Sequence, residues 1–488
     1  MNIPGLNAIA QGGNCDDPGS RRHDLLPRPR YWFAPWLSPG LHVLGRCWVQ
    51  KMTLSAAPHT TLGTYTKSIH AVRKAARNND PEWADRKSKQ QAGRYALMRT
   101  AQGLLWKKGN EWKEQNRTCW CCRSMKRDTG TVSVYRNDDG SGASLTGLNR
   151  CGNIWTCPVC AAKVAETRRA ELSAALVSHL GNQGAAYLLT LTFPHEADHP
   201  MAELLEKFTN ARQRLQNSRT WKNIMRDAGR LGSVASLEVT ISQENGWHPH
   251  LHLLIFANAN GFAEGDPMNE QGDLISTAII ELKHAWVNIL LKTGLGDQRK
   301  LADMLQHALN VRGGNQAAEY IAKYGRDERW GQSSEMTRHY AKQGSAGERD
   351  GLLHFTPFQL LTWAGNGDEW ATRKFIEYSE AIEGKRAVTW SPGLKKALLG
   401  NDDQRTDEEI AADDSVMPEQ LHVGDLEQDQ YQVLFRHNRL PDFIRYVANS
   451  ATCQEDLDDY INAIKSTPAT HSGAVVIKGA FAGHYMVQ

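Results

Sequence analysis

Two neighbouring stretches in which apolar and polar residues alternate strictly constrain the fold of this 488-residue chain more than any other feature. They lie in SVASLEVTISQENGWHPHLHLLIFA, residues 233–257, on either side of QENGW. Because successive side chains of a β-strand point to opposite faces, the pattern predicts two strands, each with one apolar and one polar face. Both apolar faces can be buried together only if the hairpin loop has an odd number of residues, so a two-residue Asn245-Gly246 turn is not expected.

The polar face of this hairpin carries candidate metal ligands. His248, His250 and His252 alternate along the second strand and therefore share one face, which they are expected to share with Glu238 of the first strand. In a register centred on Asn245, Glu238 lies directly opposite His252. A carboxylate beside imidazoles on rigid strands predicts a divalent-metal site, for which this mixed ligation favours Mg²⁺ or Mn²⁺, although histidines also accept zinc.

The cysteines predict a second metal site. Six of the nine lie between residues 119 and 160, and they include two C-x-x-C pairs. In a reducing compartment such pairs indicate structural Zn²⁺ more than disulfides. The predicted ligands are Cys119, Cys122, Cys157 and Cys160, and Cys121 or Cys151 can replace one of the four.

The elements around the hairpin favour an α+β fold. A strand is predicted at 185–195, and helices are predicted at 161–180, 200–218 and 276–292. Helices interspersed with strands that form a hairpin favour an antiparallel central sheet with flanking helices over a parallel α/β sheet. The cysteine-rich segment precedes this core.

A pair of tyrosines follows the core strands in the sequence YIAKY. Tyr320 and Tyr324 are four residues apart, so in a helix both phenols lie on one face, with Lys323 beside Tyr324. The Lys323 cation can contact a phosphate or lower the pKa of the phenol. Because an isolated pair at this spacing is more often part of a core, its interpretation depends on the metal site.

Together, three motifs in this order resemble the HUH endonucleases, the initiators of rolling-circle replication. They are LLTLTFPH at 188–195, HLHLLI at 250–255 and YIAKY at 320–324. The segment RCGNIWTCPVCAAKV, residues 150–164, is similar to the cysteine stretch that precedes the core in many plasmid Rep proteins. The resemblance covers about residues 117–395.

This resemblance implies a ferredoxin-like βαββαβ core and a metal-dependent, site-specific single-strand DNA endonuclease and strand transferase. His250 and His252 would hold the catalytic metal, with Glu238 favoured over His248 as third ligand. Tyr324 would be the nucleophile that forms a 5′-phosphotyrosine, and Tyr320 makes the chain similar to the two-tyrosine members. The expected partners are single-stranded or extruded origin DNA and the host replication machinery, including a helicase, since the chain has no G-x-x-x-x-G-K-[ST] motif.

Two other functions remain open. A rolling-circle transposase uses the same histidines and two tyrosines, but RCGNIWTCPVC and VTWSPGLKK favour replication. A zinc-ribbon DNA-binding regulator would leave the histidines and tyrosines unexplained. A zinc hydrolase is disfavoured, because HExxH does not occur.

Charge and hydropathy bear on partners and location. Residues 401–420 carry eight acids and one arginine, a net charge of −7, which leaves +10 on the rest of a chain whose total is +3. A basic body suits a nucleic-acid partner. There is no apolar run of about 18 residues and no signal peptide, so a cytoplasmic protein without a membrane partner is expected.

The sequence thus divides into seven predicted regions. They are a poorly ordered N-terminal arm (1–65), a basic helical region (66–116), a cysteine-rich zinc module (117–165), the nuclease core (166–345), a helical extension of the core (346–400), an acidic linker (401–424) and a C-terminal accessory region (425–488).

Overall fold

The computed structural model describes residues 82–259, 261, 262, 269, 273–313, 348, 349, 352–400 and 405–466. The chain divides after Thr60 into two units, and every described residue belongs to the second. The predicted N-terminal arm, residues 1–65, and the residues Tyr320, Lys323 and Tyr324 lie outside the described residues.

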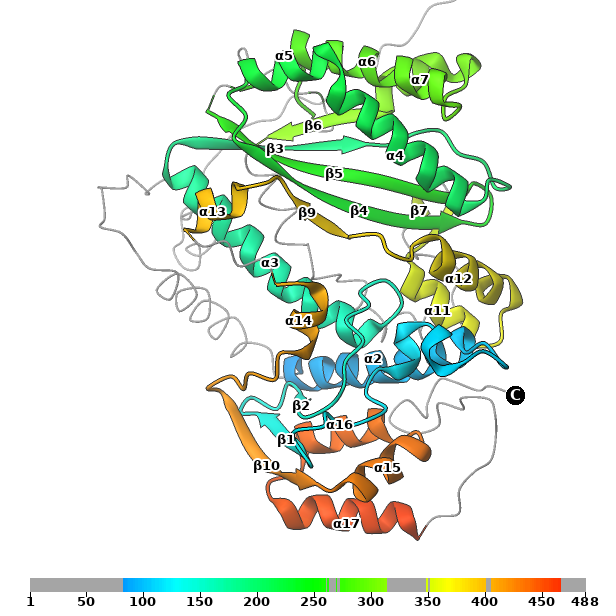
Figure 1. The fold of residues 1–488 in the computed structure, drawn as a ribbon, viewed down its shortest axis with the longest axis vertical. Helices are drawn as coiled ribbons and strands as arrows, with labels where there is room; N and C mark the ends of the chain where they lie inside the picture. Colours follow the sequence, from blue (N-terminus) through cyan, green and yellow to red (C-terminus); the bar gives the residue numbers. More distant parts are fainter. Residues whose placement is uncertain are drawn as a thin grey trace, which may run out of the picture. The chain divides into compact units, whose positions relative to one another are not determined.

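The fold is α+β, with antiparallel sheets and flanking helices, as predicted (Figure 1). Its larger sheet has seven strands in the order β6-β3-β5-β4-β8-β7, and β9 also pairs with β4. Among the described residues, all of its neighbouring strands pair in antiparallel orientation. The strands are β3 (Gly184–Leu191), β4 (Gly232–Ser242), β5 (Gly246–Asn258), β6 (Leu309–Gly313), β7 (Glu348–Arg349), β8 (Leu352–Phe355) and β9 (Val388–Trp390).

Four of these strands follow one another in a strand–helix–strand–strand–helix–strand succession. Between β3 and β4 the chain forms α4 (Met201–Asn217) and α5 (Arg219–Asp227). Between β5 and β6 it forms α6 (Thr277–Thr293) and α7 (Leu301–His307). In the sheet the fourth, first, third and second of these strands lie side by side.

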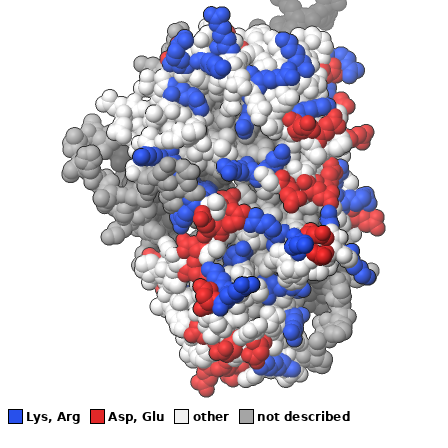
Figure 2. Space-filling model, viewed as in Figure 1, with Lys and Arg blue, Asp and Glu red and all other residues white. Residues whose placement is uncertain are grey.

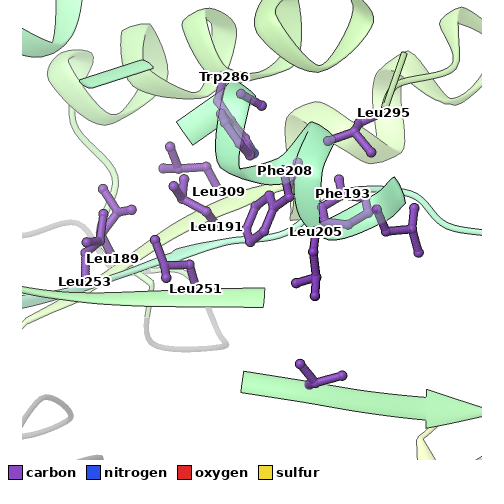
Figure 3. Packing of buried hydrophobic residues seen from close by; sticks show 14 of the residues in the cluster. Leu189, Leu191, Phe193, Leu205, Phe208, Leu251, Leu253, Trp286, Leu295 and Leu309 are labelled. Atoms are coloured by element: carbon purple, nitrogen blue, oxygen red, sulfur yellow. The ribbon is translucent and has the colours of Figure 1, made fainter. Parts of the chain in front are cut away.

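One face of the large sheet is buried under α4 and α6. Leu189 and Leu191 of β3 and Leu251 and Leu253 of β5 are at most 3% exposed. Figure 3 shows the leucines of β3 and β5 in one cluster with Phe208 of α4 and Trp286 of α6. Each side chain of this size contributes about 1.5–3 kcal/mol when fully buried, so this layer anchors the sheet. The prediction that the second strand of the hairpin has one apolar face is confirmed, because Leu251, Leu253 and Ile255 all lie in this core.

The opposite face is divided between an apolar half and a polar half. Leu254 and Phe256 of β5 pack with α3 (Pro158–Gly181) and α13 (Leu394–Leu399) in a second cluster. By strand alternation these residues share their face with the three histidines of β5. The histidines lie beyond the apolar cluster along the same strand, so the polar half of this face is where a ligand can approach.

The hairpin register differs from the prediction by two residues. Ser242 pairs with Gly246, which leaves the three-residue loop 243–245 and confirms the odd loop length. Glu238 is opposite His250, so the expected pairing of Glu238 with His252 is wrong. Gly246 has a left-handed φ of 70°, and a Cβ there would lie 2.8 Å from the Ala197 backbone, so glycine is required where β5 begins. A two-residue shift preserves strand parity, and the polar face is therefore unchanged.

A smaller sheet packs with the cysteine-rich segment. Its order is β10-β1-β2. The sheet shares one buried cluster with five cysteines and with helices from both ends of the described chain. The elements in and around this part are α2 (Trp83–Leu105), η1 (Trp112–Glu114), η2 (Arg117–Trp120), β1 (Val132–Asn137), β2 (Ala143–Leu145), α11 (Pro357–Gly365), α12 (Glu369–Ala381), α14 (Asp407–Ala412), β10 (Gln420–Leu426), α15 (Gln428–Arg436), α16 (Leu440–Asn449) and α17 (Gln454–Lys465).

The acidic segment 401–424 differs from the linker that its composition suggested. Its described part contains α14 and the first residues of β10, which pairs with β1. Basic side chains of the preceding segments bind its acids, which offsets the local charge. These ion pairs are Arg117–Glu408 at 2.6 Å, Lys126–Asp414 at 2.8 Å and Arg168–Asp407 at 3.1 Å.

The region predicted as 346–400 also differs from a purely helical extension, because β8 and β9 both pair with β4. Among the described helices, none combines the length and apolar character needed to span a membrane.

Candidate metal centres

Strands β4 and β5 bring three predicted ligands together on the polar half of the large sheet. Glu238 Oε2 lies 3.1 Å from His250 Nε2 and 3.5 Å from His252 Nε2. At metal–ligand distances of about 2.1 Å, adjacent donors are roughly 3.0 Å apart in octahedral and 3.4 Å apart in tetrahedral sites. Both distances suit neighbouring ligands of one divalent cation, and all three donor atoms lie within 4.8 Å of one another.

The second nitrogen of each ligand imidazole is bonded to a different oxygen. His252 Nδ1 lies 2.9 Å from Thr190 Oγ1, its cross-strand neighbour on β3. His250 Nδ1 lies 3.4 Å from the backbone oxygen of His248 and can donate to it. Bonds of this kind fix the ring orientation and favour the tautomer in which Nε2 is free to bind a cation.

The carboxylate of this group stays ionised. Burial alone would raise the pKa of Glu238, but hydrogen bonds with His250 and His252 hold it well below its ordinary value. The Glu238 side chain is 40% exposed, against 16% and 14% for the two histidines. The negative charge is thus at the accessible edge of the group, where a cation can reach it.

His248 has different partners from the other two histidines. Its Nε2 lies 3.2 Å from Thr192 Oγ1, and its ring stacks on His195 with centroids 4.5 Å apart. The donor group on β4 and β5 contains Glu238 and not His248. This geometry favours Glu238 as third ligand.

Thr190, Thr192 and His195 were not assigned a role from the sequence. The signal that would have found the threonines is the alternation in LLTLTFPH, which places Thr190 and Thr192 on the same polar face of one strand. His195 follows the end of β3, so no periodicity marks its contact with His248.

Four buried cysteines form the second group. Their sulfur atoms all lie within 4.8 Å of one another, with Cys160 Sγ at 3.5 Å from Cys121 Sγ and 3.6 Å from Cys151 Sγ. A disulfide would require about 2.05 Å, whereas four thiolates around zinc at 2.3 Å are roughly 3.8 Å apart. The set, which fits a structural zinc ion, is Cys121, Cys151, Cys157 and Cys160.

Of the four cysteines that were predicted as ligands, the group contains Cys157 and Cys160 but not Cys119 or Cys122, although Cys122 Sγ lies 3.7 Å from Cys121 Sγ. Cys119 Sγ is 3.8 Å from the backbone oxygen of Gln102. Cys122 has a left-handed φ of 58°, and its sulfur accepts a hydrogen bond from Arg150 Nη1 at 2.7 Å. Geometry therefore favours Cys121 and Cys151 as the partners of Cys157 and Cys160, because backbone direction, and not C-x-x-C spacing, decides which thiols converge.

The protonation of the thiols is consistent with a site that needs a cation. Hydrogen bonds from the surrounding thiols, Cys122 first, lower the pKa of Cys121. Burial raises the pKa of Cys151 and Cys157. Without a cation, burial thus opposes a full set of thiolates, and a bound zinc ion would offset this cost.

Comparison with known proteins points to replication. Residues 144–271 match a family model described as "Replication protein", and this range contains Glu238, His250 and His252. The chain is 29% identical over 318 residues to "Protein rep" of Streptomyces lividans, an alignment that covers 55% of this chain and 67% of the relative. It is 30% identical over 165 residues to "Neomycin resistance protein" of Streptomyces cyanogenus, covering 29% of this chain and 37% of the relative. No solved structure gives a significant match.

Part of the chain is therefore similar to Rep-type replication proteins.

Proposed function

We propose that this protein initiates rolling-circle replication as a metal-dependent HUH single-strand DNA endonuclease and strand transferase. The observation that carries the proposal is the group of Glu238, His250 and His252 on an open sheet face, inside the segment that matches replication proteins. The same matched segment contains three of the four buried cysteines that fit a zinc ion, namely Cys151, Cys157 and Cys160.

The residues of the sheet would prepare the scissile phosphate for attack. A divalent ion bound there would supply positive charge next to a non-bridging phosphate oxygen. His250 and His252 would hold the ion through Nε2, and Glu238 would complete the protein's share of the coordination. Thr190 would keep His252 oriented while the phosphate binds and leaves.

Tyr324, which lies outside the described residues, is the proposed nucleophile. Its phenolic oxygen would form a bond to phosphorus as the bond from phosphorus to the 3′ oxygen breaks. The phenol loses its proton and the departing 3′ oxygen gains one, so the products are a 5′-phosphotyrosine and a free 3′-hydroxyl. One phosphoester replaces another, and the reaction therefore needs neither ATP nor a ligase.

Tyr320, also outside the described residues, is proposed to act at termination. A tyrosine that is already esterified cannot accept a second 5′ end, so a second phenol is needed to cut the regenerated origin. Lys323 would contact phosphate beside Tyr324. This assignment rests on the sequence YIAKY and its resemblance to two-tyrosine initiators.

The relatives favour replication over the two alternatives. A rolling-circle transposase would use the same chemistry, but the matching family model is described as "Replication protein" and the Streptomyces lividans relative as "Protein rep". A regulator that only binds DNA would not need the grouped donors on the sheet.

The first experiment removes the metal ligands. His250→Ala combined with His252→Ala should abolish Mn²⁺- or Mg²⁺-dependent nicking of a single-stranded origin oligonucleotide while leaving its binding largely intact. His422→Ala, a histidine exposed on β10, is the matched control and should nick normally. Nicking that survives the double change would remove this group from the mechanism.

The second experiment tests the tyrosines. Tyr324→Phe should stop the first nick and remove the covalent peptide–DNA adduct seen by mass spectrometry, since only the hydroxyl is lost. Tyr320→Phe should still nick and form the adduct but should fail to release circular single strands. Release of circles by Tyr320→Phe at the wild-type rate would show that Tyr320 has no role in termination.

A further inference from the structure

Two tryptophans are exposed next to the cysteine-rich segment. Trp106, at the end of α2, is 40% exposed, and Trp112, in η1, is 58% exposed. Among the described residues, no other Trp, Tyr or Phe side chain is exposed to this extent. Exposed tryptophans are costly to leave in water, so a pair of them indicates a contact surface.

The two rings are held in place by their neighbours. The centroid of Trp106 lies 6.0 Å from that of Trp112 and 5.9 Å from that of Trp120, both in edge-to-face geometry. The guanidinium of Arg123 is 5.3 Å from the centre of the Trp106 ring and 5.2 Å from that of Trp112. Trp120 packs against the main hydrophobic core. Because these contacts already restrict the two tryptophan side chains, binding a ligand would cost little further conformational entropy.

The charges around the rings suit a phosphate backbone. Residues 106–123 contain five Lys or Arg and two Glu, so the segment is net basic. The ion pairs Lys107–Glu380 and Lys113–Glu111 are more than half exposed on both sides. Such exposed pairs contribute little to stability, so their lysine side chains can leave them and bind phosphate at little cost in free energy. On the face seen in Figure 2, Lys and Arg are mixed with Asp and Glu over much of the surface.

We infer that Trp106 and Trp112, backed by Arg123, form a stacking platform for unpaired bases of single-stranded DNA, separate from the metal group on the large sheet. Aromatic rings accept any base, because every base has a π-face, and the flanking cations would bind the backbone without regard to sequence. The choice of DNA as the occupant rests on the proposed function. An apolar segment of a protein partner would not explain the basic residues between the rings.

The test measures binding of the full-length protein to a fluorescent oligothymidylate without a nick site. Trp106→Ala and Trp112→Ala should each weaken binding by about 5- to 100-fold, the loss of one stacked base. Trp112→Phe should restore much of the affinity, which shows that a lost fold is not the cause. Leu180→Ala, which truncates another exposed apolar side chain, is the matched control and should bind normally.

A second ligand separates stacking from charge. An abasic oligonucleotide of equal length keeps the phosphates, and the tryptophan variants should bind it as the wild type does. Equal losses on both ligands, or unchanged oligothymidylate binding by Trp106→Ala and Trp112→Ala, would overturn the platform. If the wild-type protein nicks no origin DNA but still binds oligothymidylate through these tryptophans, the proposed function is wrong and the stacking platform is still supported.

Discussion

At the scale of single residues, the histidines of β5 differ in the oxygen atom that each imidazole contacts. Thr190 of β3 contacts Nδ1 of His252, whereas Thr192, directly after the end of β3, contacts Nε2 of His248. The first contact uses Nδ1 of His252 and leaves its Nε2 directed at Glu238. The second contact uses Nε2 of His248 itself, so that atom already has a partner. Substituting each threonine separately therefore tests which histidines belong to the proposed metal site.

Thr190→Val should lower Mn²⁺ affinity by about 10- to 100-fold, because it removes the hydroxyl that fixes a ligand imidazole while keeping side-chain volume. The measurement is a calorimetric Mn²⁺ titration of the full-length protein.

Thr192→Val is the matched control for this titration. If Glu238 and not His248 is the third ligand, the Thr192 variant should bind Mn²⁺ as tightly as the wild type. Equal losses in both variants would instead place His248 in the coordination shell.

At the scale of elements, the cysteine group joins segments that are separate in sequence. Cys121 directly follows η2, Cys151 lies in a loop, and Cys157 and Cys160 lie at the start of α3. Pro158 occupies the first position of that helix, where a missing backbone N–H costs nothing. The helix start thus presents two thiols at fixed spacing, and the third and fourth come from elements that pack against it.

Cys121→Ser should release zinc, whereas Cys119→Ser should retain it, because only the first sulfur lies in the convergent group. The measurement is the zinc content of protein purified without chelator. Zinc lost from Cys119→Ser and retained by Cys121→Ser would restore the spacing-based ligand set, and a wild-type protein without zinc would rule out both sets.

At the scale of the described molecule, α3 belongs to two hydrophobic clusters. Its first turns carry Cys160 and Val164 into the cluster of the cysteine-rich segment, and further along Leu172 and Leu176 pack on the large sheet. Residues from α15, α16 and α17, hundreds of positions later in sequence, complete the first of these clusters. Packing against the C-terminal part of the chain therefore stabilises the group of four cysteines.

Phe443→Ala should destabilise the protein by about 3–5 kcal/mol and speed zinc loss to a chelator, because this fully buried ring of α16 packs in the same cluster as the cysteines. Phe208→Ala removes an equally buried ring under the large sheet and is the control. Chelator kinetics below the melting transition check the prediction. Similar zinc release from both variants would mean that the two clusters are not independent.

The sequence by itself determined the features that depend on near neighbours along the chain. Strand alternation placed His250 and His252 on one face and Leu251 and Leu253 on the other, and Glu238 joins the histidines in any register with an odd hairpin loop. The odd hairpin loop followed from the same parity. The α+β class followed from the succession of strands and helices.

Only the tertiary structure decided what depends on contacts between distant segments. The crowding of Gly246 against Ala197 accompanies a register two residues from the expected one. The backbone direction at Cys122 turned its sulfur to Arg150 and left Cys121 to meet Cys160. The end of the acidic segment pairs with β1, and basic side chains far away in sequence, such as Lys126, offset the charge of its acids. Periodicity and spacing fix the face on which a side chain lies, but its partners across space are set by packing, which a local pattern does not encode.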